Sequence, residues 1–296
     1  NWGDWDPDQP VLSVLCCTFN HGHCIDRALA GIFSQKVDFS FEVIVQNDAS
    51  TDDTKDVIDH WLLRFPNILR PIHLKKNVYS QRKKPTELAL PACKGEFIAM
   101  CDGDDYWIDE NKLQKQVGFL RANPDFVLHF FDCYELTEGV VNKSSSKMER
   151  TGLRGGVYSE LEMGARLTIF PTTSCFRNVL KVPFPSYFYK TKSTDTLMTA
   201  MLSRHGKAYV DGSNKAAVYR VSSQGVWSLS CATEKYYESL HVRVVRAQFL
   251  DGEEVARDLI LLSLLRSVIK RVGLIRIVVS AIKLLYFVMK RSVTFK

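Results

Sequence analysis

The stretch FIAMCDGDDYW, at residues 97–107, joins a short apolar run to three carboxylates. An apolar run bounded by turn residues predicts a buried strand, and Gly103 allows a tight turn directly after it. Asp102, Asp104 and Asp105 repel one another there unless a cation lies between them. Mg²⁺ and Mn²⁺ prefer oxygen ligands and commonly join one or two carboxylates to substrate phosphates. The stretch therefore predicts a metal and phosphate site at a strand end; the alternative is a solvated acidic turn that caps the next helix.

The composition is that of a globular protein, with 46% apolar and 24% charged residues among 296. Eight cysteines without a CxxC pair predict reduced thiols in a cytosolic protein. The segment CCTFNHGHC, at residues 16–24, raises the alternative of a zinc site. We do not expect zinc, because Cys16 and Cys17 point to opposite faces of a strand and no second ligand pair follows.

The net charge of +6 is unevenly distributed. Residues 257–296 hold nine Lys or Arg and one acid, so residues 1–256 have a net charge of −2. A basic tail is typical of proteins that bind nucleic acid or an anionic membrane surface. The N-terminus shows no signal-peptide pattern.

Apolar runs and helical patterns alternate through the first half of the chain. This alternation predicts an α/β fold with a mostly parallel central sheet and helices on both faces. The expected strands are 11–17, 41–45, 68–74, 96–101 and 126–131, and the expected helices are 25–35, 57–65, 85–93 and 112–123.

The pattern fails at residues 137–158, where serine and glycine clusters predict a long flexible loop. Mixed segments follow at 169–176 and 216–221, with a helix around 195–204 between them. From about residue 233 to the end the chain reads as helical.

Three motifs together resemble the family 2 glycosyltransferases, which have the GT-A fold. They are VLSVLCCTFN at 11–20, EVIVQNDASTDDT at 42–54, and KGEFIAMCDGDDYW at 94–107 followed by KLQKQ at 112–116. The resemblance covers roughly residues 11–230. It implies a nucleotide-sugar-binding half at 11–135 and an acceptor-binding half at 136–230. A leader at 1–10 and a helical, basic C-terminal extension at 231–296 complete the expected organisation.

The resemblance implies donor contacts in the first two motifs. The first loop and the second turn hold the base and ribose in such enzymes, which points to Thr18, Asn20, Asp48 and Ser50. A carboxylate such as Asp48 can accept the N–H of a uracil-type base. The alternative for Asp48 and Ser50 is simple helix capping.

The third motif implies the metal site. Asp104 would bind Mn²⁺ or Mg²⁺, Asp102 would lie near the ribose and the metal, and Asp105 would have a structural role. The family segment around Arg220 implies a contact with the donor. Ser222 stands where the family usually has a histidine.

The catalytic base of the family is an Asp at the start of a helix in the acceptor half. Asp195 matches it, although Thr194 replaces the acid expected before it. The alternative is that Asp195 only caps the helix.

The resemblance implies a metal-dependent, inverting glycosyltransferase with a UDP-sugar as the expected donor. The acceptor would be a hydroxyl of a glycan or of a lipid-linked glycan, as in bacterial surface-glycan assembly. The QxxRW signature of processive synthases is absent, which favours single additions. The alternatives are a nucleotidyltransferase and a non-catalytic nucleotide-binding, membrane-associated protein.

The C-terminal tail combines apolar residues with Arg276, Lys283 and Lys290, which recur every seven residues. On a helix they form a narrow cationic stripe, a pattern typical of helices that lie in a membrane interface. The run 273–289 is short for a membrane span. We therefore expect a cytoplasmic protein, peripheral at the inner face of the membrane, with no nucleic-acid partner. The alternative is packing on the body or on a second subunit of a homodimer.

Overall fold

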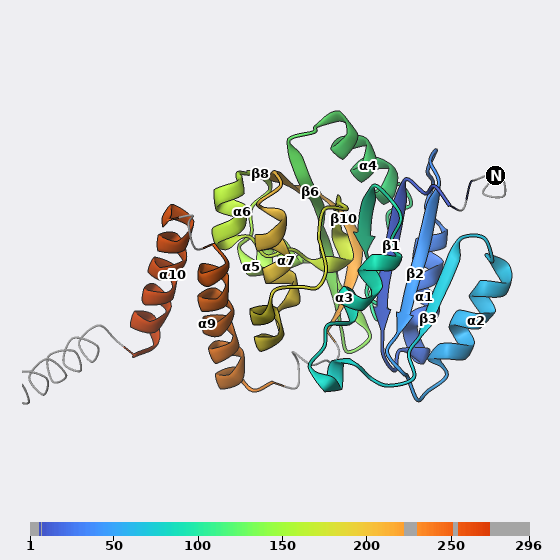
Figure 1. Cartoon of the computed structure of the whole chain (residues 1–296), viewed down its shortest axis with the longest axis horizontal. Helices are drawn as coiled ribbons and strands as arrows, with labels where there is room; N and C mark the ends of the chain where they lie inside the picture. The colour runs from blue at the N-terminus through green and yellow to red at the C-terminus, as the bar shows by residue number, and fades with distance from the viewer. Residues whose placement is uncertain (1–5, 7, 222–229, 251–253, 273–296) are drawn as a thin grey trace, which may run out of the picture.

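The chain folds around one ten-stranded sheet in the order β3-β2-β1-β4-β9-β6-β10-β5, with β7 beside β6 and β8 beside β10. The computed structural model describes residues 6, 8–221, 230–250 and 254–272. Helices cover both faces of the sheet (Figure 1). This architecture confirms the predicted α/β class.

The first half of the sheet is parallel. Strand β1 pairs with β2 and β4, and β2 pairs with β3, all in the same direction. Every residue of β2 and β4 is buried, as expected for strands with helices on both faces. The elements of the first half of the chain are β1 (Leu12–Thr18), α1 (Gly22–Phe33), β2 (Phe41–Asn47), α2 (Thr54–Arg64), β3 (Leu69–His73), α3 (Pro85–Ala89), β4 (Phe97–Met100), β5 (Tyr106–Trp107) and α4 (Lys112–Ala122). Strand β5 lies at the far edge of the sheet, where it pairs antiparallel with β10.

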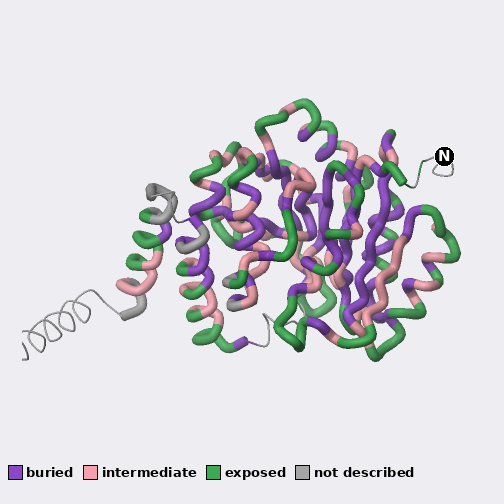
Figure 2. Tube along the Cα trace, viewed as in Figure 1, coloured by how far each residue is buried: buried purple, intermediate pink, exposed green. Residues whose placement is uncertain are grey.

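The second half mixes both strand directions. Strand β9 is antiparallel to β4 and β6, whereas β6 and β10 form a long parallel pair. Figure 2 shows the buried residues concentrated along the central strands. The elements are β6 (Phe126–Thr137), β7 (Val140–Asn142), α5 (Lys147–Thr151), β8 (Gly156–Tyr158), α6 (Glu160–Arg166), β9 (Ser174–Arg177), α7 (Thr194–Leu202) and β10 (Lys207–Val221).

The prediction of a flexible loop at 137–158 was wrong. This stretch contains β7, α5 and β8. Each is only three to five residues long, too short to show the hydrophobic periodicity on which the prediction relied. Ser146 and Glu149 form a reciprocal capping box that starts α5. Gly156 at φ 127° begins β8, which pairs with β10.

Two helices, α9 (Ala232–Phe249) and α10 (Glu254–Val272), follow the sheet and pack on α6 and α7. Buried Arg246 donates from Nε to the carbonyl of Gly164 and from Nη2 to those of Met163 and Leu167, at the end of α6. These carbonyls lack helical partners, so Arg246 satisfies the C-terminus of α6. In the part of the chain that the structure describes, no helix has the length and apolarity needed to cross a bilayer. The predicted cationic stripe lies outside the described residues.

A lysine is buried in the core beside Trp107. Lys112 is fully buried, donates from Nζ to Gln116 Oε1 at 2.8 Å, and lies 4.0 Å from the centroid of the Trp107 ring. Burial lowers the pKa of Lys112 to about 8, because the ammonium loses its hydration. The folded chain therefore holds this proton less tightly than the unfolded chain does.

We expect the stability advantage of the wild type over Lys112→Met to rise with pH. Because the folded pKa of about 8 is below the ordinary value of 10.5, the unfolded state binds more protons between these values. Stability then rises with pH across this window, by up to about 1.4 kcal/mol per pH unit, and the variant lacks this term. Urea unfolding of both proteins from about pH 8 to about pH 10 measures it. Parallel pH profiles for the two proteins would contradict the expectation.

Candidate active site

The three sequence motifs meet at the carboxyl ends of β1, β2 and β4. The backbone N–H of Asp48 donates to the carbonyl of Thr18 at 2.9 Å. The N–H of Gly103 donates to the carbonyl of Cys17 at 3.0 Å. These strands are parallel, so their carboxyl ends lie at one edge of the sheet, where ligands bind in open α/β folds.

Asn20 and Ser50 connect the first loop to the second. The N–H of Asn20 donates to Ser50 Oγ at 2.9 Å, and Asn20 Oδ1 accepts from the N–H of Thr51 at 2.8 Å. Asn20 and Ala49 have φ values of 55° and 59°, in the left-handed region. The two loops therefore form one unit at the edge of the sheet, with Asn20 exposed.

Asp48 is buried and its carboxylate is already engaged. Oδ1 accepts from the N–H of Val78 at 2.7 Å and Oδ2 from the N–H of Tyr79 at 3.1 Å. The helix-capping alternative is wrong for Asp48, because its two carboxylate oxygens accept from Val78 and Tyr79 and not from α2. At the start of α2, Asp52 Oδ1 accepts from the N–H of Thr54 instead. Asp48 thus fixes the 78–79 segment beside the second loop, and its contact with a base stays a prediction.

Thr18 and His21 pack tightly against the acidic turn, which is formed by residues 102–105. Thr18 Oγ1 and His21 Nδ1 are buried without a hydrogen-bond partner in the structure. A Cβ atom at Gly103 would lie 2.5 Å from Thr18 Oγ1 and 3.0 Å from His21 Nδ1. Only glycine fits between these two loops at their present separation.

We expect Gly103→Ala to weaken nucleotide binding by roughly tenfold or more. A loss of about 1.4 kcal/mol of binding free energy, caused by a displaced turn, corresponds to this factor. The added methyl group pushes the acidic turn away from the first loop. Calorimetric titration with UDP and Mn²⁺ measures the effect. Gly118→Ala is the matched control, because a Cβ atom at Gly118 meets no atom within 4 Å. Equal affinities for both variants would show that this contact does not shape the nucleotide site.

The carboxylates of the acidic turn have different environments. Burial, together with the negative charges of Asp104 and Asp195, raises the pKa of Asp102 to about 7. Asp105 is buried, its Oδ1 accepts from Arg220 N–H at 2.7 Å, and burial raises its pKa. The turn is therefore not a solvated cap, and the structural role expected for Asp105 agrees with its burial.

Asp104 is partly exposed and faces the first loop. Its Oδ2 lies 4.0 Å from His21 Nε2, and the side chain is 24% exposed. Among the described residues no group of three or more His, Cys, Asp or Glu is arranged to hold a metal ion. An open site of one or two carboxylates completed by substrate phosphates needs no such group. Burial and the negative charges of Asp104 and Asp195 raise the pKa of Asp102, and a divalent cation beside these carboxylates would favour their charged form.

Arg220 supports the acidic turn through its backbone and side chain. Besides the N–H contact with Asp105, its Nε donates to the carbonyl oxygen of Asp104 at 2.9 Å. Arg220 therefore binds the loop that carries the proposed metal ligands. Its predicted contact with the donor stays a prediction, and Ser222 lies outside the described residues.

Asp195 is the second residue of α7, after Ser193 at the N-cap position. Its Oδ1 accepts from the N–H of Thr196 at 2.9 Å. Burial raises the pKa of the Asp195 carboxyl, which makes it a stronger proton acceptor than an exposed aspartate. The Asp195 side chain thus accepts a hydrogen bond from the first turn of α7 and also lines a large cleft.

A cleft of about 1460 Å³ contains both Asp102 and Asp195. It extends from the end of β4 across the second half of the sheet to α9. Its lining includes the following residues: Thr86, Met100, Asp102, Glu135, Lys147, Arg150, Arg154, Tyr158, Arg166, Phe170, Lys192, Asp195, Met198, Tyr219 and Lys235. The cleft therefore joins the acidic turn to the acceptor half expected from the resemblance.

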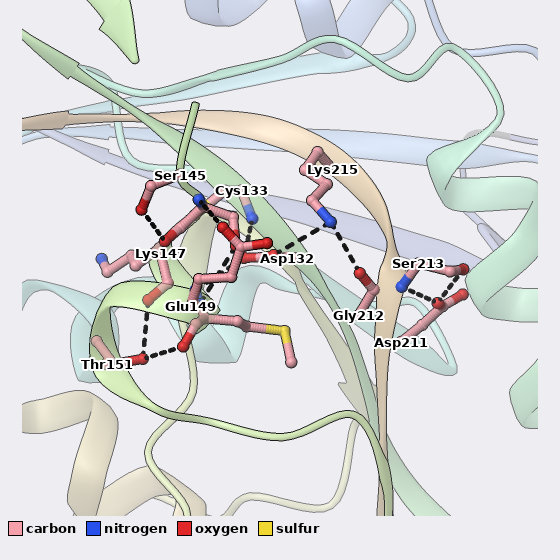
Figure 3. Close-up of polar contacts among 12 residues, drawn as sticks. Asp132, Cys133, Ser145, Lys147, Glu149, Thr151, Asp211, Gly212, Ser213 and Lys215 are labelled. Carbon is pink, nitrogen blue, oxygen red and sulfur yellow. Dashed lines mark hydrogen bonds and ion pairs between the residues drawn. The ribbon is translucent and has the colours of Figure 1, made fainter. Parts of the chain in front are cut away.

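Lys147 is a cleft residue that the sequence analysis missed. Its Nζ lies 3.1 Å from the centroid of the Tyr219 ring, and its charge acts on the carboxyls of Asp102 and Asp195. Figure 3 shows the start of α5, where buried Asp132 Oδ1 accepts from the N–H of Met148 at 3.0 Å. The capping box around Lys147 is the signal that could have revealed this helix.

The comparison with family models decides the family. The model described as glycosyl transferase family 2 matches residues 13–179, more than half of the chain. The chain belongs to glycosyl transferase family 2. The matched segment contains the first loop, the second turn and the acidic turn, and ends before Asp195.

Curated relatives of this family 2 chain match parts of it. An uncharacterised protein of Mycobacterium tuberculosis is 38% identical over 121 residues, which are 40% of this chain and 34% of that protein. The chain thus spans about a third of the length of this relative. TarS of Staphylococcus aureus, a poly(ribitol-phosphate) β-N-acetylglucosaminyltransferase, is 26% identical over 84% of this chain and 43% of TarS.

Solved structures show the fold. TarS residues 1–349 in complex with UDP have a TM-score of 0.61 at 22% identity, covering 88% of this chain and 72% of that chain. The mannosyltransferase PcManGT of Pyrobaculum calidifontis, in complex with GDP-Man and Mn²⁺, has a TM-score of 0.60 at 17% identity. It covers 99% of this chain and 87% of that chain. The predicted GT-A fold is confirmed.

Proposed function

We propose that the chain is a glycosyltransferase that moves a sugar from a nucleotide diphosphate, expected to be UDP, to an acceptor hydroxyl with inversion. The observation that carries this proposal is the cleft that joins Asp102 and Asp195. One carboxylate belongs to the turn at the strand ends, and the other begins a helix in the second half. Two carboxylates with separate environments suit separate roles in one reaction.

The donor nucleotide is proposed to bind at the edge formed by Thr18, Asn20, Asp48 and Ser50. The contacts between the two loops support this assignment, since they bring all four residues to one place. TarS binds UDP and PcManGT binds GDP-Man, and both share the fold. These ligands support a nucleotide donor.

In the proposed mechanism Asp195 accepts the proton of the acceptor hydroxyl as its oxygen attacks the anomeric carbon. Asp104, together with Asp102, would hold Mn²⁺ or Mg²⁺, which would neutralise charge on the leaving diphosphate. Lys147 contributes positive charge to the same cleft without belonging to the acidic turn. In this proposal the sugar would lie between the residues that hold the leaving diphosphate and the Asp195 carboxylate.

Peripheral membrane association would suit a lipid-linked acceptor. Leu261, Leu262 and Leu265 on α10 are about half exposed, an unusual state for neighbouring leucines. Together with the cationic pattern predicted for the segment after α10, they support a helical region that binds an anionic membrane surface. Flotation of the intact protein with anionic vesicles tests this part of the proposal.

A screen of nucleotide sugars by thermal unfolding, with and without Mn²⁺, tests the function. A ligand that binds the folded protein raises its unfolding temperature by mass action. The nucleotide sugar that raises this temperature most is then taken as the donor. Transfer assays with that donor then distinguish sugar transfer, which releases the nucleoside diphosphate, from nucleotidyl transfer, which releases pyrophosphate. Failure of every nucleotide to protect the protein would overturn the proposal.

A further inference from the structure

The cleft gathers positive charge from four separate elements. Lys147 comes from α5, Arg154 from the segment after α5, Lys192 from the segment before α7, and Lys235 from α9. Resting on the proposed transfer reaction, we propose that Arg154, Lys192 and Lys235 bind a phosphate group of the acceptor. The acceptor would thus carry phosphate close to the hydroxyl that receives the sugar.

The acids of the cleft do not neutralise these cations. Glu135 is bound on both oxygens by Arg150, at 2.6 and 2.7 Å. Asp102 and Asp195 have the roles proposed above. In the part of the chain that the structure describes, no ion pair reaches Arg154, Lys192 or Lys235; the Nζ of Lys192 lies 3.4 Å from Ser230 Oγ. These charges are therefore accessible to an anion from outside the protein.

The charge of the whole acceptor half agrees with this assignment. Residues 136–230 contain 13 Lys or Arg and 6 Asp or Glu, a net charge of +7. Residues 11–135 contain 14 and 18, a net charge of −4. Unlike charges of this size would attract a polyanionic acceptor to one side of the cleft only. A neutral glycan would gain nothing from this asymmetry.

The three cations are distinct from the donor end of the cleft. Lys147 is half-buried, with its Nζ 3.1 Å from the centroid of the Tyr219 ring, whereas Arg154 and Lys192 are exposed. Lys147 therefore belongs with the reacting centre, where the donor diphosphate is proposed to leave. The outer three suit a second phosphate, which a guanidinium and two ammonium groups bind by charge-assisted hydrogen bonds.

Direct binding tests the inference with two phosphate probes, a short glycerol phosphate oligomer and a short prenyl diphosphate. The wild type is first saturated with UDP and Mn²⁺, so that the donor site is filled. Oligoglycerol of the same length is the uncharged probe. We expect at least one phosphate probe to bind at least ~10-fold more tightly than oligoglycerol, and the preference to fall with salt. The tighter of the two identifies a polymer or a lipid diphosphate as the source of the phosphate.

The variant Arg154→Gln, Lys192→Gln, Lys235→Gln should lose this preference by at least ~10-fold while binding UDP normally. The matched control is Lys83→Gln, Lys143→Gln, Lys181→Gln, which removes three exposed charges that do not line the cleft. Equal loss in both variants, or no loss in either, would overturn the inference. Failure of UDP to bind to the wild type would instead count against the proposed function, and phosphate binding can then still be measured without nucleotide.

Discussion

Asp195→Asn is expected to lower turnover by at least ~10²-fold, because general-base catalysis contributes ~10²–10⁴-fold. Asparagine cannot accept the proton of the acceptor hydroxyl. Its amide oxygen can still accept the hydrogen bond that Thr196 N–H donates to Asp195 Oδ1 at 2.9 Å. The substitution therefore removes the base and keeps the contact at the start of α7. Initial rates with the donor found by the thermal screen measure the effect.

Two further measurements separate catalysis from helix capping. Nucleotide affinity and unfolding temperature should stay near the wild-type values in Asp195→Asn, since asparagine is favourable near a helix start. Asp211→Asn is a suitable control, because Asp211 Oδ1 accepts from the N–H and the hydroxyl of Ser213 and its side chain does not line the cleft. If Asp195→Asn and Asp211→Asn both keep most of their turnover, the base lies elsewhere, and Glu135 is the next candidate, since it lines the cleft outside the acidic turn.

Asp104→Asn is expected to remove the part of nucleotide affinity that depends on Mn²⁺, a loss of at least ~10-fold, since a metal supplies several kcal/mol of charge stabilisation. The amide is neutral and cannot balance a divalent cation. The fold should persist, because Asp104 is partly exposed and its carboxylate has one distant contact, with His21 at 4.0 Å. Calorimetry with UDP, in the presence of Mn²⁺ and in its absence, gives the two affinities.

The control for Asp104 must remove a carboxylate without disturbing the turn. Asp105→Asn is unsuitable, because buried Asp105 accepts from the N–H of Arg220. Asp125→Asn is suitable, since Asp125 is exposed and its nearest cationic partner is Lys207 at 3.8 Å. Mn²⁺-dependent UDP binding that is unchanged in Asp104→Asn would remove this residue from the metal site and leave Asp102 as the candidate.

The first half of the fold could be predicted because its strands are continuous apolar runs, as expected for strands covered by helices on both faces of the sheet. Strands β2 and β4 begin or end within two residues of their predicted bounds. Strand β6 was predicted only to residue 131 and continues to Thr137, because beyond Asp132 it carries polar residues and pairs with β10 and β7. Long-range pairing decides such strands, and one sequence does not display it.

The candidate site was only partly predictable for the same reason. Motif positions located Asp102, Asp104 and Asp195, because their neighbours in sequence identify them. Lys147 depends on where α5 lies, and α5 is held by a hydrogen bond from Met148 N–H to Asp132, sixteen residues earlier. Likewise, the role of Asp48 at residues 78 and 79 arises from contacts thirty residues away.

Arg246 limits how far the chain can be truncated from its C-terminal end without loss of stability. Its guanidinium satisfies the last carbonyls of α6, so a truncation ahead of α9 would strip three buried acceptors of their donor. Each unsatisfied buried group costs about 1–3 kcal/mol, a large share of the stability of an ordinary domain. Any test of the segment after α10 should therefore cut after Val272, where α10 ends. A loss of vesicle binding after such a cut could then be assigned to the removed segment rather than to an unravelled body.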